Sequence, residues 1–165
     1  RMTVAENVAL PLRYHREPAR EALEHRVRAV LELTELTAFA NSTPANLARN
    51  WRKRAGLARA LILQPEVLLL DDPLAGLEAR HGAWWLQFLA AASRGADWLD
   101  GRPLTIVASA SDLRPWRARS PRIACLIERQ FRVFRDWQEL DQSGETRVRE
   151  LLNAELPVID PRDGI

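Results

Sequence analysis

The sequence predicts an α/β fold built around a parallel β-sheet. The first observation is the run Val67–Leu70, an unbroken series of branched apolar residues. Such a run is typical of a strand that is covered on both faces, as in a parallel sheet. The second observation is the alternation of strand-like and helix-like segments after this run, which favours parallel strands joined by helices over hairpins.

A mainly helical part precedes this sheet. Residues 2–18 open with a short helix or turn that we expect to end near Pro11. Apolar residues then recur at helical spacing over 19–36 and again over 47–63, with turn-forming residues between them over 41–46.

The expected order after the first strand is helix, strand, helix. The helix should run from about Glu78 to Ala92, and the strand over 104–111 should bury Ile106 and Val107. Asp112 is a suitable N-cap for a further helix.

The last part predicts a hairpin followed by short helices. Residues 122–128 and 131–134 read as two short strands joined by a tight turn at 128–130. Two short helices are expected over 136–155, followed by a loose tail over 156–165. We therefore expect one domain over 1–165, with a helical part (1–63), a core (64–135) and a helical tail (136–165).

Composition and charge limit the function classes. The chain has 165 residues, 47% hydrophobic and 28% charged, and a net charge of +2, as in an ordinary globular protein. Its arginines are scattered along the sequence, so no nucleic-acid partner is expected. Cys125 is alone, which excludes an internal disulfide and is consistent with a reducing compartment. No apolar run reaches the roughly 18 residues that a membrane span needs, and no leader opens the chain, so a cytoplasmic location is expected.

Four stretches occur in an order and at separations that resemble ABC-type ATPases. "EVLLLDDPLAGLEARH" resembles the Walker B strand and D-loop, and "LARNWRKRAGLARALILQP" resembles the signature helix, usually written LSGGQ-x-x-R-x-x-x-A-R-A-L. "LTIVASASDL" stands where the family has a strand ending in Thr-His-Asp, and "TVAENVALPL" resembles the segment after the Q-loop. The tail "WQELDQSGETRVRELLNAE" resembles the ATPase subunits of Mla-type lipid transporters.

This resemblance implies a P-loop NTPase-like ABC ATPase domain without its N-terminal Walker A part: a helical subdomain followed by a parallel-sheet core. The phosphate-binding motif G-x-x-x-x-G-K-[ST] is absent from the sequence, and the only lysine, Lys53, lies inside the signature helix. The family places that motif ahead of the point where this chain starts, at Arg1 and not at a methionine. The motif has therefore been trimmed away or lost.

The paired carboxylates after the first strand have distinct implied roles. Asp71 matches the aspartate that holds Mg²⁺, a role suited to a hard oxygen ligand; the alternative is a strand-end carboxylate that caps the next turn. Asp72 replaces the glutamate that orients the attacking water and is one methylene shorter. A displacement of about 1 Å can cost on the order of a hundredfold in rate.

The signature loop departs further from the family. Two glycines there let backbone N–H groups approach a phosphate, but this chain has Leu47, Ala48, Arg49, Asn50 and Trp51. Close backbone approach is expected to be blocked. Arg49 offers a substitute phosphate contact; the preferred alternative is a plain helix start.

Two further groups complete the candidate residues. Ser111 stands at the switch-histidine position and is too short to reach a γ-phosphate, while His15, His25 and His81 are expected to be surface residues without metal-ligand spacing. The segment carrying Leu10, Leu12 and Tyr14 matches the face that receives a membrane subunit. These three residues either contact such a partner or pack inside the domain.

Three functions remain open. The first is a degenerate ATP-binding subunit of a membrane transporter, with lipid as the expected cargo and weak or no hydrolysis. It would lie on the inner face of the membrane, with a transmembrane permease and another ATPase subunit as its partners. The second is an active ATPase whose Walker A and Q-loop lie in a missing N-terminal segment, and the third is a soluble interaction module. ATP and Mg²⁺ are the cofactors that the resemblance implies, and their binding is left open.

Overall fold

The computed structural model describes residues 2–15, 19–117, 119–144 and 148, which fall into two units, one up to Ser109 and one from Ala110 onward. The first unit contains α1 (Val4–His15), α2 (Arg20–Leu33), α3 (Arg49–Leu61), β1 (Val67–Leu70), α4 (Ala79–Ser93) and β2 (Thr105–Ala108). The second contains β3 (Ile123–Ile127), β4 (Gln130–Phe134) and α5 (Trp137–Gln142). No helix among these residues is both long and apolar enough to cross a bilayer.

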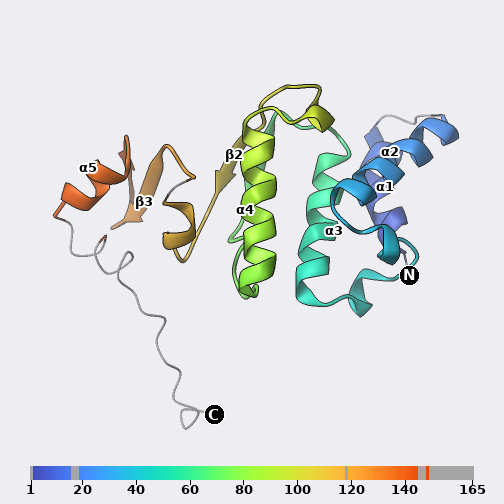
Figure 1. Cartoon of the computed structure of the whole chain (residues 1–165), viewed down its shortest axis with the longest axis horizontal. Helices are drawn as coiled ribbons and strands as arrows, with labels where there is room; N and C mark the ends of the chain where they lie inside the picture. The colour runs from blue at the N-terminus through green and yellow to red at the C-terminus, as the bar shows by residue number, and fades with distance from the viewer. Residues whose placement is uncertain (1, 16–18, 118, 145–147, 149–165) are drawn as a thin grey trace, which may run out of the picture. The chain divides into compact units, whose positions relative to one another are not determined.

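Helices α1, α2 and α3 share one apolar core. Val4, Val8 and Leu12 recur along one face of α1 and are almost fully buried. Residues from α2, α3 and the turns between them complete this core, and α3 lies between α4 and the α1–α2 pair (Figure 1). The packing places the N-terminal end of α3, which carries the signature-like residues, at a fixed position in the unit.

Helix α1 continues past Pro11 to His15. The expectation that this helix ends near Pro11 is therefore wrong. Proline removes one helical hydrogen bond. The helix survives because Val8 and Leu12, on either side of Pro11, are buried in the core, so packing outweighs the lost bond.

Strands β1 and β2 form a parallel pair in which Leu70 lies opposite Ala108, as expected for an α/β core. Only one face of this pair is covered by described residues: Leu68 is buried, whereas Val67, Leu69 and Val107 are exposed. The expectations that β1 is covered on both faces and that Val107 is buried are therefore wrong for these residues. Alternation along a strand places neighbouring side chains on opposite faces, and no described element packs over the outer one.

The second unit contains the predicted hairpin. Strands β3 and β4 pair antiparallel, and Glu128 and Arg129 form the turn with φ values of 49° and 66°. The helix expected from Asp112 is wrong, because only a single 3₁₀ turn forms, over Arg114–Trp116. Asp112 accepts a hydrogen bond from the Arg114 backbone N–H (2.9 Å), which favours a local turn.

The first expected tail helix is confirmed as α5. Most of the second expected helix and all of the tail over 156–165 lie outside the described residues.

Candidate functional site

The two aspartates stand at the carboxyl end of β1, beside the end of β2. Ser109 Oγ donates to Asp71 Oδ1 (2.7 Å) and accepts from the Asp72 backbone N–H (2.9 Å). Parallel strands end at the same edge of a sheet, which is why a serine 38 residues from Asp71 reaches it. The sequence analysis assigned no role to Ser109, although its place at the end of the neighbouring strand was a usable signal.

The backbone turns sharply at Asp72, whose φ of 37° lies in the left-handed region. A side chain other than glycine is strained there and needs surrounding contacts to hold it. Ser109 supplies one such contact, and Lys53 supplies the next.

Lys53 reaches from α3 to the loop that follows β1. Its Nζ donates to the carbonyl oxygens of Asp72 (2.9 Å), Pro73 (3.0 Å) and Ala75 (3.0 Å). Burial lowers the pKa of Lys53, and repulsion by Arg49 lowers it further, while the carboxylates of Asp72 and Asp71 raise it. Sequence reasoning noted Lys53 as the only lysine but assigned it no role.

Arg49 lies against the same loop. Its guanidinium occupies the space beside Gly76, where an added Cβ would come within 2.6 Å of Nη1. Gly76 also has a φ of 64°, a backbone conformation that favours glycine, and a larger residue there would have to displace the Arg49 side chain. In this arrangement the Arg49 side chain is used for packing within the unit.

The other signature-like residues divide between surface and interior. Ala48 is exposed and caps α3 without a side-chain hydrogen bond. Asn50 is buried, with its Nδ2 3.4 Å from His81 Nδ1, and the Trp51 ring packs on Phe39 at 4.8 Å between centroids. His81 is therefore half-buried and engaged, unlike the surface histidine that was expected.

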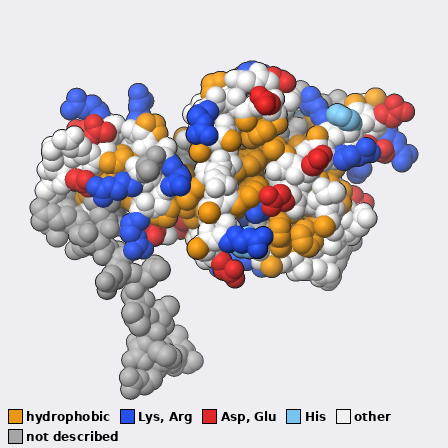
Figure 2. Space-filling model, viewed as in Figure 1, with side chains coloured by type: hydrophobic (Ala, Val, Ile, Leu, Met, Phe, Trp, Pro, Cys, Tyr) orange, Lys and Arg blue, Asp and Glu red, His pale blue; other side chains and the backbone are white. Residues whose placement is uncertain are grey.

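Helices α3 and α4 enclose a hollow of about 480 Å³ around Arg54. The Arg54 guanidinium lies 3.6 Å from the Trp84 ring centroid and 4.7 Å from that of Trp51. Arg54 Nη1 donates to Glu35 Oε2 (2.5 Å), and Trp84 Nε1 donates to Glu35 Oε1 (3.0 Å). Figure 2 shows hydrophobic side chains gathered over the region of α3 and α4.

The remaining predicted residues lie apart from this loop or in the second unit. Leu12 is buried in the helical core, as the interior alternative requires, whereas Leu10 and Tyr14 are exposed and stay candidates for a partner contact. Ser111 belongs to the second unit, whereas Asp71 and Asp72 belong to the first. His15 and His25 are exposed, as expected.

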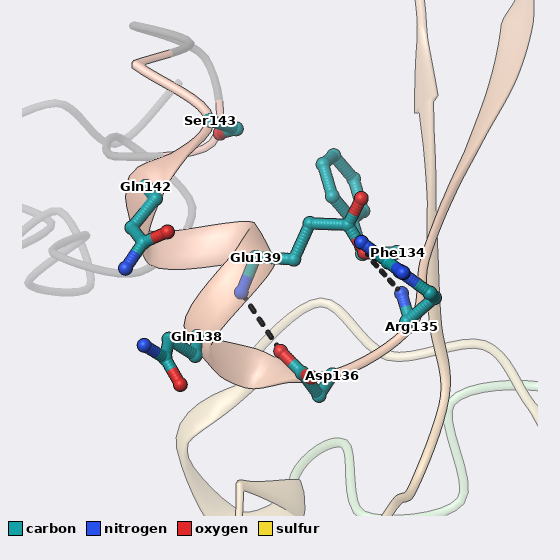
Figure 3. A pocket seen from close by; sticks show the side chains of 7 residues that line it. All are labelled: Phe134, Arg135, Asp136, Gln138, Glu139, Gln142 and Ser143. Carbon is teal, nitrogen blue, oxygen red and sulfur yellow. Dashed lines mark hydrogen bonds and ion pairs between the residues drawn. The ribbon is translucent and has the colours of Figure 1, made fainter.

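A hollow of about 420 Å³ in the second unit is lined by residues that cap α5 (Figure 3). Asp136 accepts from the Glu139 backbone N–H (2.8 Å), and Glu139 Oε2 accepts from the Arg135 backbone N–H (2.7 Å). The second bond starts at Arg135, the residue before the N-cap Asp136, so the pair resembles a capping box but does not reach the N-cap N–H. The carboxylates of Asp136 and Glu139 are therefore engaged at the start of the helix.

The described residues fit a magnesium–nucleotide group only in part. Asp71 is an exposed carboxylate at a strand end, which suits an ion that keeps most of its waters. No group of three or more histidine, cysteine, aspartate or glutamate side chains among the described residues forms a metal cluster. Since the sequence also has no phosphate-binding motif, this chain alone does not provide the set of groups that grips a nucleotide.

Comparison with known proteins shows which proteins this chain is similar to. Residues 1–75 match the profile of a family described as "ABC transporter". The trehalose/maltose import ATP-binding protein MalK of Thermococcus litoralis is 42% identical over 79 residues, which cover 48% of this chain and 21% of MalK. The sulfate/thiosulfate import ATP-binding protein CysA of Bacillus cereus is 42% identical over 82 residues, covering 48% of this chain and 23% of CysA.

Solved structures extend the match beyond residue 75. The ATP-binding cassette MJ0796, in a dimeric post-hydrolysis state with ADP and Pi, aligns with a TM-score of 0.67 and 30% identity, over 81% of this chain and 56% of that one. An inward-facing ABC transporter chain aligns over 92% of this chain with a TM-score of 0.71, and at 17% identity it supports the fold alone. The chain thus spans under a quarter of the named import proteins and about half of the solved cassettes. It has the fold of the matching part of a cassette, and its residues 1–75 are similar to part of an ABC transporter ATPase domain.

Proposed function

We propose that the protein is an ATP-binding subunit of an ABC transporter whose own hydrolytic site is weak or inactive. It acts as a structural or regulatory partner of a second ATPase subunit and of a transmembrane permease, on the inner face of the membrane. The observation that carries this proposal is the start of α3. Asn50 is buried against His81 and Trp51 packs on Phe39, so two positions that the family uses next to a phosphate serve the interior here.

The acidic pair supports the same reading. Asp72 is shorter than the glutamate that it replaces, and its backbone is fixed in a left-handed turn by Ser109 and Lys53. A carboxylate on such a short and restrained arm has little freedom to recover the lost reach. Asp71, in contrast, retains the carboxylate that a metal ligand at this position needs.

The partner surface is proposed from α1. Leu10 and Tyr14 are exposed on this helix, and Tyr14 is 82% accessible. An exposed aromatic residue beside an exposed leucine is suited to a contact with another protein.

The cargo is proposed to be a small solute. The named relatives import trehalose and maltose or sulfate and thiosulfate. The expectation of a lipid cargo rests on the segment over 137–155, of which only 137–144 and 148 are described.

An active ATPase is the second candidate. It is favoured by Asp71, which retains the metal-ligand type, and it requires a phosphate-binding motif elsewhere in the full polypeptide. A soluble interaction module without a transporter is the third, and copurification of the full-length protein with a permease would contradict it.

The test is ATP turnover by the full-length gene product, compared with its Asp72→Glu variant. We expect no turnover from the natural protein and no rescue in the variant, because the start of α3 is altered as well. Asp97→Glu, the same change at an exposed residue of the first unit, is the matched control. A natural rate near ~1 per second or faster, which is ordinary for an enzyme, would overturn the proposal in favour of the active ATPase.

A further inference from the structure

We propose that Lys53 is a positioning residue that fixes the conformation of the loop over 71–76, and with it the direction of the Asp72 side chain. This inference rests on the proposed role of Asp72 as a residue of the ATPase site. The proposed role of Lys53 is to hold the backbone of that site. The sequence motifs assign this role to no residue of α3.

The ammonium group of Lys53 uses all of its donors on one loop. A lysine Nζ carries three hydrogens and accepts none, and it lies within 3.0 Å of the carbonyl oxygens of Asp72, Pro73 and Ala75. Three carbonyl oxygens that converge on one point repel each other unless a cation lies between them. The loop therefore holds this conformation around the charge of Lys53.

The conformation is one that the loop does not prefer by itself. Asp72 has a φ of 37°, in the left-handed region that costs a side-chain-bearing residue free energy. Its carbonyl oxygen is held by Lys53 and its N–H by Ser109 Oγ, so the peptide groups on both sides of its Cα are fixed. The direction of the Cα–Cβ bond follows from these two contacts.

A second residue of α3 contacts the far end of the loop. Arg49 lies one helical turn before Lys53, on the same face of α3, and its guanidinium packs against Gly76. The loop is thus attached to α3 at both of its ends. A displacement at the start of α3, where the signature-like residues stand, would be passed to the loop through these side chains.

The experiment measures hydrogen–deuterium exchange of the full-length protein with Lys53→Met, which keeps the length of the side chain and removes its donors. The reporting amides are those of Ala75 and Leu77, which donate to the carbonyl oxygens of Asp72 (3.1 Å) and Leu74 (3.2 Å). We expect at least a tenfold faster exchange at these amides, with α1 and the second half of α4 unchanged. Lys53→Gln, which retains two N–H donors, should give a smaller increase and is the milder variant if Lys53→Met folds poorly.

Two controls separate positioning from general stability. Arg52→Met, the same loss of charge at the exposed neighbouring residue, should leave the loop unchanged. In Lys53→Ala, added n-propylammonium should restore slow exchange in the loop by filling the vacated space with an N–H donor. Tetramethylammonium has no N–H and should not.

Unchanged loop exchange in Lys53→Met would overturn the inference, as would an equal increase over α1 and α4. Because exchange is read without ATP turnover, this result is independent of the test of the proposed function. A fast natural ATPase would overturn the degenerate subunit and leave the positioning role of Lys53 in place.

Discussion

At the scale of single residues, Arg54 shows how a buried charge is accommodated. It is 2% exposed, lies between two indole rings, and meets the Glu35 carboxylate at the mouth of the hollow between α3 and α4. Glu35 adopts a φ of 57° in the turn after α2, so its contacts offset a strained backbone. The pair ties the end of α2 to α3 and α4.

Replacing Glu35 by glutamine should destabilise the protein by about 1 to 2 kcal/mol, because it leaves a buried guanidinium without its counter-charge. The value lies below that of a fully buried pair since the Glu35 side chain is 57% exposed. Urea unfolding of Glu35→Gln measures it, and Glu32→Gln on the exposed side of α2 is the control. Equal midpoints for the two variants would contradict the argument.

The same pair predicts a pH dependence. The hydrogen bond from Arg54 holds the pKa of Glu35 below its usual value of 4.5. A carboxyl group with a lowered folded pKa adds stability above its unfolded pKa and loses it as the pH falls through the folded value. The difference in free energy of unfolding between natural protein and Glu35→Gln should therefore shrink below about pH 4.5. A gap that stays constant to low pH would exclude the pair as its source.

Residue-scale chemistry was only partly predictable. The sequence located Asp71 and Asp72 because the apolar run of β1 marks where the strand ends. It did not identify Ser109 and Lys53 as their neighbours, because both contacts join segments far apart in the chain. The direction of the Asn50 and Trp51 side chains depended likewise on His81 and Phe39, which only the packing of helices brings near.

At the scale of elements, the local sequence pattern determined the bounds of some elements, and tertiary packing determined those of others. The bounds of β1 and of the β3–β4 hairpin followed from the sequence, since short apolar runs with turn residues between them leave few alternatives. The predicted end of α1 at Pro11 was wrong because the burial of Val8 and Leu12 outweighs the helical hydrogen bond that the proline removes. Asp112 misled because its carboxylate accepts a hydrogen bond from the Arg114 backbone N–H, which favours a local turn over a helix.

The hairpin turn makes a prediction at this scale. Glu128 and Arg129 both have positive φ, as in the type I′ turn, which favours glycine at its second central position. Arg129→Gly should raise the free energy of unfolding of this hairpin by about 1 kcal/mol. Gln130→Gly, the same change one residue later inside β4, should lower it. Thermal unfolding followed by circular dichroism gives the sign, and a loss of stability in both variants would contradict the assigned turn.

At the scale of the whole molecule, the chain corresponds to about half of a solved ABC cassette. Its parallel β1–β2 pair leaves Val67, Leu69 and Val107 exposed on one face. Parallel sheets in proteins are usually covered on both faces, and an open aliphatic face favours association.

We therefore expect the 165-residue chain alone to self-associate through this face, and Leu69→Lys to reduce that association. Stability should change little, because the Leu69 side chain is 74% exposed. Sedimentation velocity measures the effect. Gln138→Lys adds the same charge at an exposed residue of α5 and is the control. Association that persists in Leu69→Lys would assign it to another surface.

Lys53 gives this stretch of protein a chemical reporter. It is the only side-chain amine among the 165 residues, and its nitrogen is occupied by three carbonyl oxygens of one loop. An acylating reagent can modify that nitrogen only after the loop has released it. The acetylation rate of the peptide that contains Lys53, followed by mass spectrometry, therefore measures how often the turn beside the two aspartates opens.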